Sequence, residues 1–117
     1  MAVLDLPVPP SVNETRRLNK RALRTVEKWE RHADFFVLAA KRRPVDRLRL
    51  ERIPRFDLTI TLSEDHCKMD LDNCCKVLID YLRRIELIAN DAPKNMRRLV
   101  VEWGEAPEGV RVEVTPL

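Results

Sequence analysis

Two stretches of the chain repeat apolar residues at the three- and four-residue spacing of an amphipathic helix. The first begins near residue 19, and its apolar stripe consists of Ala22, Val26, Trp29, Ala33, Phe36 and Ala40. The basic run 41–43 before Pro44 predicts its end, because cations suit a helix C-terminus and the residue before proline resists helical geometry. The second begins near Asp72, and its stripe consists of Cys74, Leu78, Leu82, Ile85 and Ala89.

Four shorter stretches alternate apolar and polar residues with the period of a β-strand. The clearest is 56–62, where the alternation continues over seven positions. We also expect strands at 3–8, 98–103 and 110–114, the last two paired as a hairpin through 104–109. The order strand, helix, strand, helix, strand, strand predicts an α/β fold with a mixed sheet, formed by a single domain over residues 1–117.

Length and apolar runs narrow the class of protein. A chain of 117 residues is the size of one domain, because shorter pieces bury too little apolar surface to be stable. The longest apolar run, 35–40, is too short to cross a bilayer, so we expect no membrane partner. No basic and then apolar leader opens the chain, and we therefore expect a cytoplasmic protein.

Charge is distributed unevenly along the chain. Lys and Arg outnumber Asp and Glu by 14 to 8 over residues 1–60, whereas the ratio is 8 to 11 over residues 61–117. This asymmetry is typical of a protein with one part that meets phosphates and another that holds a cation. Two solvated faces of opposite charge explain it equally well.

The three cysteines, Cys67, Cys74 and Cys75, do not form a disulfide framework, because their number is odd and two are adjacent. No second Cys or His pair stands at zinc-ligand spacing. We expect the thiols to pack as small buried hydrophobes near the second helix. Trp29 is expected in the core, and Trp103 in the core or at a dimer interface.

Acidic residues gather near the second predicted helix, with Asp70 and Asp72 at its start and Asp91 after its end. Magnesium binds oxygen ligands and keeps several waters, so two or three carboxylates suffice for a site. In an extended backbone, Asp70 and Asp72 point the same way while Leu71 turns inward. With Asp72 at the helix N-cap, Lys76 lies on the same helical face, where it can approach a phosphate.

The same residues have a purely structural explanation. An Asp before a helix is a common N-cap, and a pair such as Asp72 and Lys76 at i,i+4 contributes only about 0.3 kcal/mol. Asp-Asn and Asp-Ala-Pro are also frequent turn sequences. Taken alone, these features favour capping and turn roles over a metal site.

Taken together, the spaced residues resemble the RusA-type Holliday junction resolvases, the crossover junction endodeoxyribonucleases of bacteria and their prophages. The matching segments are Pro-Pro-Ser-Val-Asn at 9–13, Asp-Leu-Asp-Asn at 70–73, Lys76, Asp80 and Asp91-Ala92. The strands expected over 99–114 correspond to the family's last strands, so the resemblance covers nearly the whole chain. The combined spacing is specific, whereas each piece alone is weak.

The resemblance implies a magnesium-dependent enzyme that resolves four-way DNA junctions by paired symmetric nicks in recombination and repair. Three carboxylates would bind Mg²⁺, or Mn²⁺ in its place: Asp70, Asp72 and Asp91. Lys76 would assist at the phosphate, with Asn73 in a supporting turn and Asp80 as a tether for Lys76. The family is dimeric, and a two-fold dimer supplies the two equivalent sites that paired nicks require.

Two departures from the family's pattern concern DNA contact. Within 64–69 only Lys68 is reliably basic, where the family often has several basic residues. The loop after Asn13 carries arginines in place of a wedging aromatic residue, so phosphate contacts are expected from this loop and the first helix. The candidate DNA-binding residues are Asn13, Arg16, Arg17, Lys20, Arg21, Arg24 and Lys68.

Two alternatives to a junction resolvase are open at this point. A nuclease for forks or flaps would use the same metal site, and competition between branched substrates would separate the two. A non-catalytic DNA-binding dimer would use the aspartates only as caps and turns, and these residues would then not bind magnesium.

Overall fold

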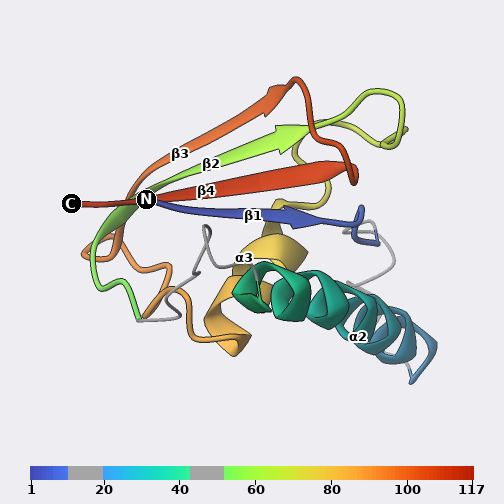
Figure 1. Ribbon diagram of the computed structural model, residues 1–117, viewed down its shortest axis with the longest axis horizontal. Coiled ribbons are helices and arrows are strands. Elements are labelled where there is room, and N and C mark those ends of the chain that lie inside the picture. The colour runs from blue at the N-terminus through green and yellow to red at the C-terminus, as the bar shows by residue number, and fades with distance from the viewer. Residues whose placement is uncertain (11–19, 43–51) are drawn as a thin grey trace.

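The sheet is built around β2 (Phe56–Leu62), whose apolar side chains at every second position are fully buried. The computed structural model describes residues 1–10, 20–42 and 52–117. In it, β2 pairs in parallel with β3 (Met96–Trp103) and antiparallel with β4 (Val110–Pro116), while β1 (Ala2–Leu6) pairs antiparallel with β4. The order is β1-β4-β2-β3, and the expectation of an α/β domain with a mixed sheet and two helices is confirmed (Figure 1).

The expected hairpin between the last two strands is wrong. β3 and β4 lie on opposite sides of β2, so the connection 104–109 crosses the end of β2. The Gly104 N–H donates to the Leu62 carbonyl and the Ser63 N–H to the Gly109 carbonyl, each at 3.0 Å, which ties the crossing to β2. Val110, Val112 and Val114 of β4 are fully buried, whereas much of β3 is exposed, and β3 therefore suits the edge of the sheet.

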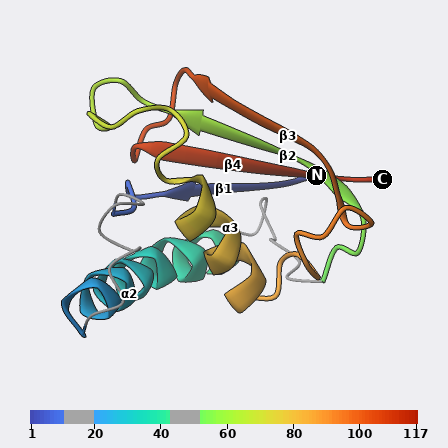
Figure 2. The same ribbon diagram turned by 180° about the vertical axis from the view of Figure 1, so that it is seen from behind.

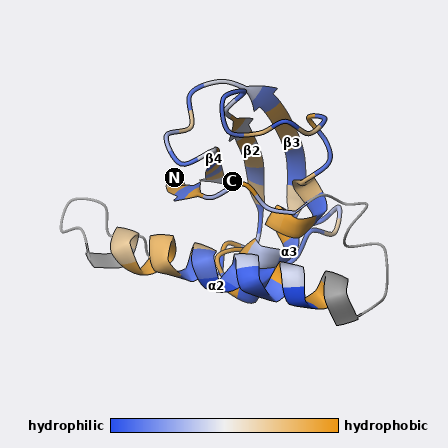
Figure 3. Ribbon diagram, turned by 90° about the vertical axis from the view of Figure 1, so that its right-hand side faces the viewer, coloured by the Kyte–Doolittle hydropathy of each residue, from blue (hydrophilic) through white to orange (hydrophobic). Residues whose placement is uncertain are grey.

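Both helices cover the same face of the sheet (Figures 1 and 2). Helix α2 (Lys20–Arg42) packs beside β1 and buries Trp29, Ala33 and Val37, and it carries both hydrophilic and hydrophobic residues along its length (Figure 3). The Trp29 Nε1–H donates to the Pro7 carbonyl at 3.0 Å. The predicted helix and the core position of Trp29 are confirmed. No helix in the described ranges is both long enough and apolar enough to span a membrane.

Helix α3 (Cys75–Arg84) begins later than expected, and the predicted N-cap at Asp72 is wrong. The Asn73 N–H donates to the Asp70 carbonyl at 3.0 Å and the Cys75 N–H to the Asp72 carbonyl at 3.4 Å. These hydrogen bonds close turns, so Asp72 lies in a turn and not in the extended backbone that was expected there. Cys74 is the N-cap and makes no side-chain capping hydrogen bond.

Helix α3 also ends earlier than its apolar stripe predicted. Glu86 has a φ of 61°, and its N–H donates to the Arg83 carbonyl while the Leu87 N–H donates to the Leu82 carbonyl. This is the hydrogen-bond pattern of a Schellman motif, which terminates a helix by a left-handed residue. Ala89 therefore lies beyond the helix and is exposed, whereas Leu87 is buried and continues the core.

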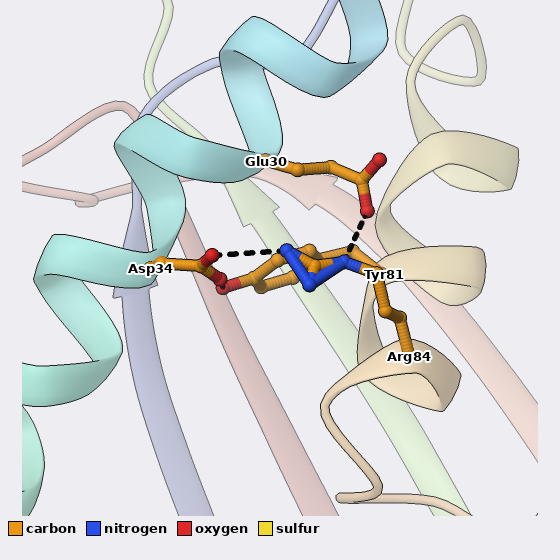
Figure 4. A network of polar contacts seen from close by, with 4 residues as sticks. All are labelled: Glu30, Asp34, Tyr81 and Arg84. Carbon is orange, nitrogen blue, oxygen red and sulfur yellow. Dashed lines mark hydrogen bonds and ion pairs between the residues drawn. The ribbon is translucent and has the colours of Figure 1, made fainter.

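Four side chains fasten α3 to α2 (Figure 4). The Tyr81 hydroxyl donates to Asp34 at 2.7 Å, and the Arg84 guanidinium contacts both Glu30 at 2.6 Å and Asp34 at 2.9 Å. The Tyr81 ring meets Trp29 edge to face, with centroids 5.1 Å apart. A buried aromatic ring with a satisfied hydroxyl fixes the rotation of a helix, so this contact determines which face of α3 points outward.

We predict that Glu30→Gln removes a pH-dependent component of stability. Burial raises the pKa of Glu30 above its ordinary value of 4.5, although the charge of Arg84 opposes this. The folded protein then binds this proton more tightly than the unfolded chain, so stability falls as pH rises through the raised pKa. In urea unfolding from about pH 4 to about pH 7, the Gln variant should gain stability relative to the natural chain as pH rises.

Glu108→Gln, at an exposed turn, is the control and should follow the natural chain at every pH. A Glu30→Gln curve that stays parallel to the natural one would show that Glu30 does not titrate differently in the folded state.

Candidate active site

The loop between β2 and α3 presents Asp70 and Asp72 at the surface. Leu71 between them packs against the hydrophobic core, while both aspartates are exposed. Within the described residues, neither carboxylate has a hydrogen-bond or ion-pair partner. These two side chains are therefore available to a ligand.

Lys76 lies at the centre of a cluster of charged side chains on the outer side of α3. Its Nζ is 3.0 Å from Oδ1 of Asp80 and 3.7 Å from Oδ2 of Asp91. The other carboxylate oxygen of Asp91 is 3.6 Å from Nη1 of Arg83. We call Lys76, Asp80, Arg83 and Asp91 the charge cluster. Two acids and two bases balance within it, and Asp91 is held between two cations.

Backbone and amide hydrogen bonds fix the segment that carries Asp91. The Asp91 N–H donates to Oδ1 of Asn90 at 2.9 Å, and the Asn95 N–H donates to the Ala92 carbonyl at 2.8 Å. The buried Asn95 side chain donates to the Pro54 carbonyl at 2.7 Å. Asp91 thus projects from a turn that is anchored to the start of β2.

The structure brings together three of the predicted site residues, Lys76, Asp80 and Asp91. The expected tether between Asp80 and Lys76 is present, and Asn73 lies in a turn as expected. Over 1–10, 20–42 and 52–117, no three acidic, histidine or cysteine side chains are grouped closely enough to hold one metal ion. The convergence of all three aspartates on one cation stays a prediction.

The donor chemistry of the three aspartates suits a hard divalent cation. Magnesium prefers carboxylate oxygens and keeps some of its waters, so it does not need a closed cage of protein ligands. Asp70 and Asp72 offer exposed oxygens, and the contacts of Asp91 at 3.6 and 3.7 Å are longer than hydrogen bonds. Ion pairs of this kind at a surface are weak and exchange readily. The donor atoms of these residues, taken by their chemistry alone, therefore suit Mg²⁺ or Mn²⁺.

The cysteines beside this loop pack as hydrophobes. Cys67 and Cys74 are buried and unbonded, as expected. Burial raises the pKa of Cys74 to about 12, with further upward contributions from the neighbouring thiols. Burial, and then the charge of Asp72, raise the pKa of Cys75. Neutral thiols are poor metal ligands and poor nucleophiles, so the groups that this loop offers to a cation are its carboxylates.

The candidate DNA-binding residues fall into three groups. Asn13, Arg16 and Arg17 lie outside the described residues. Lys20 and Arg21 belong to the first turn of α2, where only the backbone is described. Arg24 on α2 is exposed, as is Lys68, whose Nζ donates to the Glu64 carbonyl at 3.1 Å. The last two are therefore accessible to a phosphate.

Two residues of the site were not predicted. Arg83 contacts Asp91, and the spacing of 76, 80 and 83 on one helical face could have indicated it. Asn95 anchors the Asp91 segment through a contact with Pro54, distant along the chain, for which the local sequence gives no signal.

Comparison of the sequence with models of known protein families gives no match, and no curated protein sequence matches it.

We predict that Asp80→Asn lowers the pKa of the Lys76 amine more than Asp91→Asn does. The hydrogen bond to Asp80 is the main cause that raises this pKa above 10.5, and the charge of Asp91 is a smaller one. NMR titration of the lysine side-chain signals measures the pKa directly. Asp57→Asn on β2 is the control and should leave it unchanged. An unaltered Lys76 pKa in both cluster variants would contradict the geometry of the charge cluster.

Proposed function

We propose that this chain is a magnesium-dependent DNA endonuclease that resolves four-way junctions by paired symmetric nicks. In this proposal it acts as a homodimer on branched DNA in the cytoplasm, in recombination and repair. One observation carries the proposal: Lys76 Nζ lies between the carboxylates of Asp80 and Asp91, so separate parts of the motif that resembles the resolvases meet beside α3. The contact with Asp80 follows from helical spacing, so the support comes from Asp91, which helical spacing does not bring to Lys76.

Three aspartates are proposed to hold the ion: Asp70, Asp72 and Asp91. An ion held there would supply Lewis acidity for the hydrolysis of a phosphodiester bond and would make a water more acidic. Asp70 and Asp72 are exposed on a loop, and Asp91 is half-buried on an anchored turn. The loop can adjust to the ion, while Asp91 provides a fixed ligand.

Lys76 is suited to stabilising charge on the phosphate in the transition state. The contacts with Asp80 and Asp91 raise its pKa, so the amine is positively charged at neutral pH. The side chain is 62% exposed, and a DNA phosphate can therefore reach it. The short contact with Asp80 orients the amine, whereas the 3.7 Å contact with Asp91 is the one that a phosphate and an ion would replace.

The cap of α3 weighs against a non-catalytic role for the aspartates. If Asp72 served only as a helix cap, its side chain would bond to the first N–H groups of α3. The N-cap is Cys74, and Asp72 stands two residues earlier, exposed and without a partner among the described residues. The side chain of Asp72 is therefore not occupied by a capping hydrogen bond and is accessible to a ligand.

We predict that Asp72→Asn reduces nicking of a mobile four-way junction in magnesium by about 10²-fold or more, because one carboxylate ligand is lost. Junction binding should be unchanged or tighter, because a charge that repels DNA is removed. Nicking on a denaturing gel and binding by gel shift measure the two effects separately.

Asp65→Asn, exposed in the same loop but outside the motif, is the matched control and should cut normally. Normal cutting by Asp72→Asn would remove Asp72 from the metal site. Equal cutting of forks and junctions by the natural chain would favour the more general branched-DNA nuclease.

We also predict that Lys68→Ala weakens junction binding. The slope of log affinity against log salt concentration should become shallower by the amount expected for about one lost phosphate contact. Lys68 is exposed two residues before Asp70, where the DNA backbone must pass if that residue binds the ion. Arg55→Ala removes the same charge at the opposite end of β2 and should leave the slope unchanged. A Lys68→Ala slope equal to the natural one would exclude this residue from the DNA interface.

A further inference from the structure

β3 is an edge strand with an open side. The sheet order ends at β3, and no described strand pairs with its outer edge. Helix α2 packs beside β1, at the opposite edge of the sheet (Figure 1). An unpaired edge of eight residues without proline is a template for pairing with another strand.

The backbone groups of Leu99 and Val101 point to this open side. Trp103 lies beside Leu62 in the parallel ladder, and the Gly104 N–H donates to the Leu62 carbonyl at 3.0 Å. Because N–H and C=O groups of successive strand residues point alternately to the two sides, residues 98, 100 and 102 face β2 as Gly104 does. Residues 99, 101 and 103 therefore have no partner among the described strands.

The two faces of β3 differ in chemistry. Leu99 and Trp103 lie beside buried residues of β2 on the helix side of the sheet, yet they are 41% and 38% exposed. Arg98 and Glu102 lie on the opposite face, are exposed, and make no side-chain ion pair or hydrogen bond in the described part of the chain. The strand therefore combines uncovered apolar residues with one unpaired charge of each sign.

We propose that β3 pairs antiparallel with β3 of a second copy of the chain, around a two-fold axis at Val100. In this register Leu99 lies opposite the partner's Val101, and Arg98 lies opposite the partner's Glu102. The two four-stranded sheets become one continuous eight-stranded sheet.

This register satisfies hydrogen bonding and charge together. Leu99 and the partner's Val101 both direct their backbone groups to the open side, so they form a hydrogen-bonded pair. Arg98 and the partner's Glu102 then occupy a non-hydrogen-bonded position, where side chains are closest and opposite charges stabilise pairing. Each contact occurs twice by symmetry. Sliding one strand by two residues would set Arg98 opposite Val100 or Gly104 of the other copy, and both ion pairs would be lost.

The apolar face supports the same partner. Leu99, Val101 and Trp103 of both copies would form one row on the helix side and cover surface that a single copy leaves exposed. A second copy is the occupant that supplies a complementary charge and an apolar residue at each position, because the strand is complementary to itself. A two-fold interface requires this property.

The two-fold axis stands perpendicular to the sheet, so both helical layers lie on the same side of it. Both candidate active sites then face in one direction, as a single branched DNA would require. The role of this interface in cutting branched DNA rests on the proposed function. The pairing itself is argued from β3 alone and can be tested without DNA or metal.

The test is sedimentation equilibrium of the purified chain without DNA or magnesium. We expect a species of twice the 13.7 kDa chain mass. Glu102→Arg sets Arg98 opposite a second arginine and should weaken self-association by about tenfold or more. The double variant Arg98→Glu/Glu102→Arg restores opposite charges across the axis and should restore the dimer. Glu108→Arg, at an exposed turn, is the matched control and should remain dimeric.

Hydrogen exchange locates the contact independently of the variants. The amides of Leu99 and Val101 should become protected as protein concentration rises, whereas the Val100 amide, which faces β2, should be protected at every concentration. A chain that stays monomeric at about 0.1 mM, or a Glu102→Arg variant that dimerises like the natural chain, would overturn the interface. A dimer with these properties that does not nick DNA would contradict the proposed nuclease function but not the proposed interface.

Discussion

The parallel pairing of β2 with β3 is the constraint on which the candidate site depends. Parallel neighbours cannot be joined by a tight turn, so the chain has to leave the end of β2 and return to the start of β3. α3 lies in this crossover. The loop that enters it carries Asp70 and Asp72, and the segment that leaves it carries Asp91 back along the helix, against Lys76 and Arg83. One strand pairing therefore brings the ends of a long sequence segment to the same helix.

α3 depends on its surroundings for its position. A helix of ten residues without a side-chain cap is too short to be stable alone, so tertiary contacts must hold it. Leu78 and Leu82 bury one face against the core, and Tyr81 and Arg84 fasten a second to α2. The remaining face carries the charge cluster. With two faces fixed by packing and hydrogen bonds, the rotation of the helix is determined, and Lys76 is held where Asp91 can reach it.

The local sequence pattern predicted individual helices and strands correctly. It failed for features that depend on contacts between two elements, such as strand pairing. The alternation over 56–62 and the stripe around Trp29 indicated β2 and α2, because each pattern arises when a strand or helix buries one of its faces. A hairpin and a crossover leave the same alternation in the last two strands, so their separation by β2 was not predictable. Because Asp is a common N-cap, the sequence predicts a helix start at Asp72, whereas backbone turns keep this residue outside α3. The contact of Lys76 with Asp80 follows from helical spacing, but its contact with Asp91 depends on the whole crossover.

The central claim is that Asp70, Asp72 and Asp91 share a divalent cation beside Lys76. A crystal grown with Mn²⁺, measured at the manganese absorption edge, tests this most directly, since anomalous scattering locates the metal without reference to activity. If the three aspartates share the ion, the peak lies about 2 Å from a carboxylate oxygen of each of them. A peak bound by the loop pair while Asp91 keeps its ion pairs with Lys76 and Arg83, or no peak at this place, would contradict it.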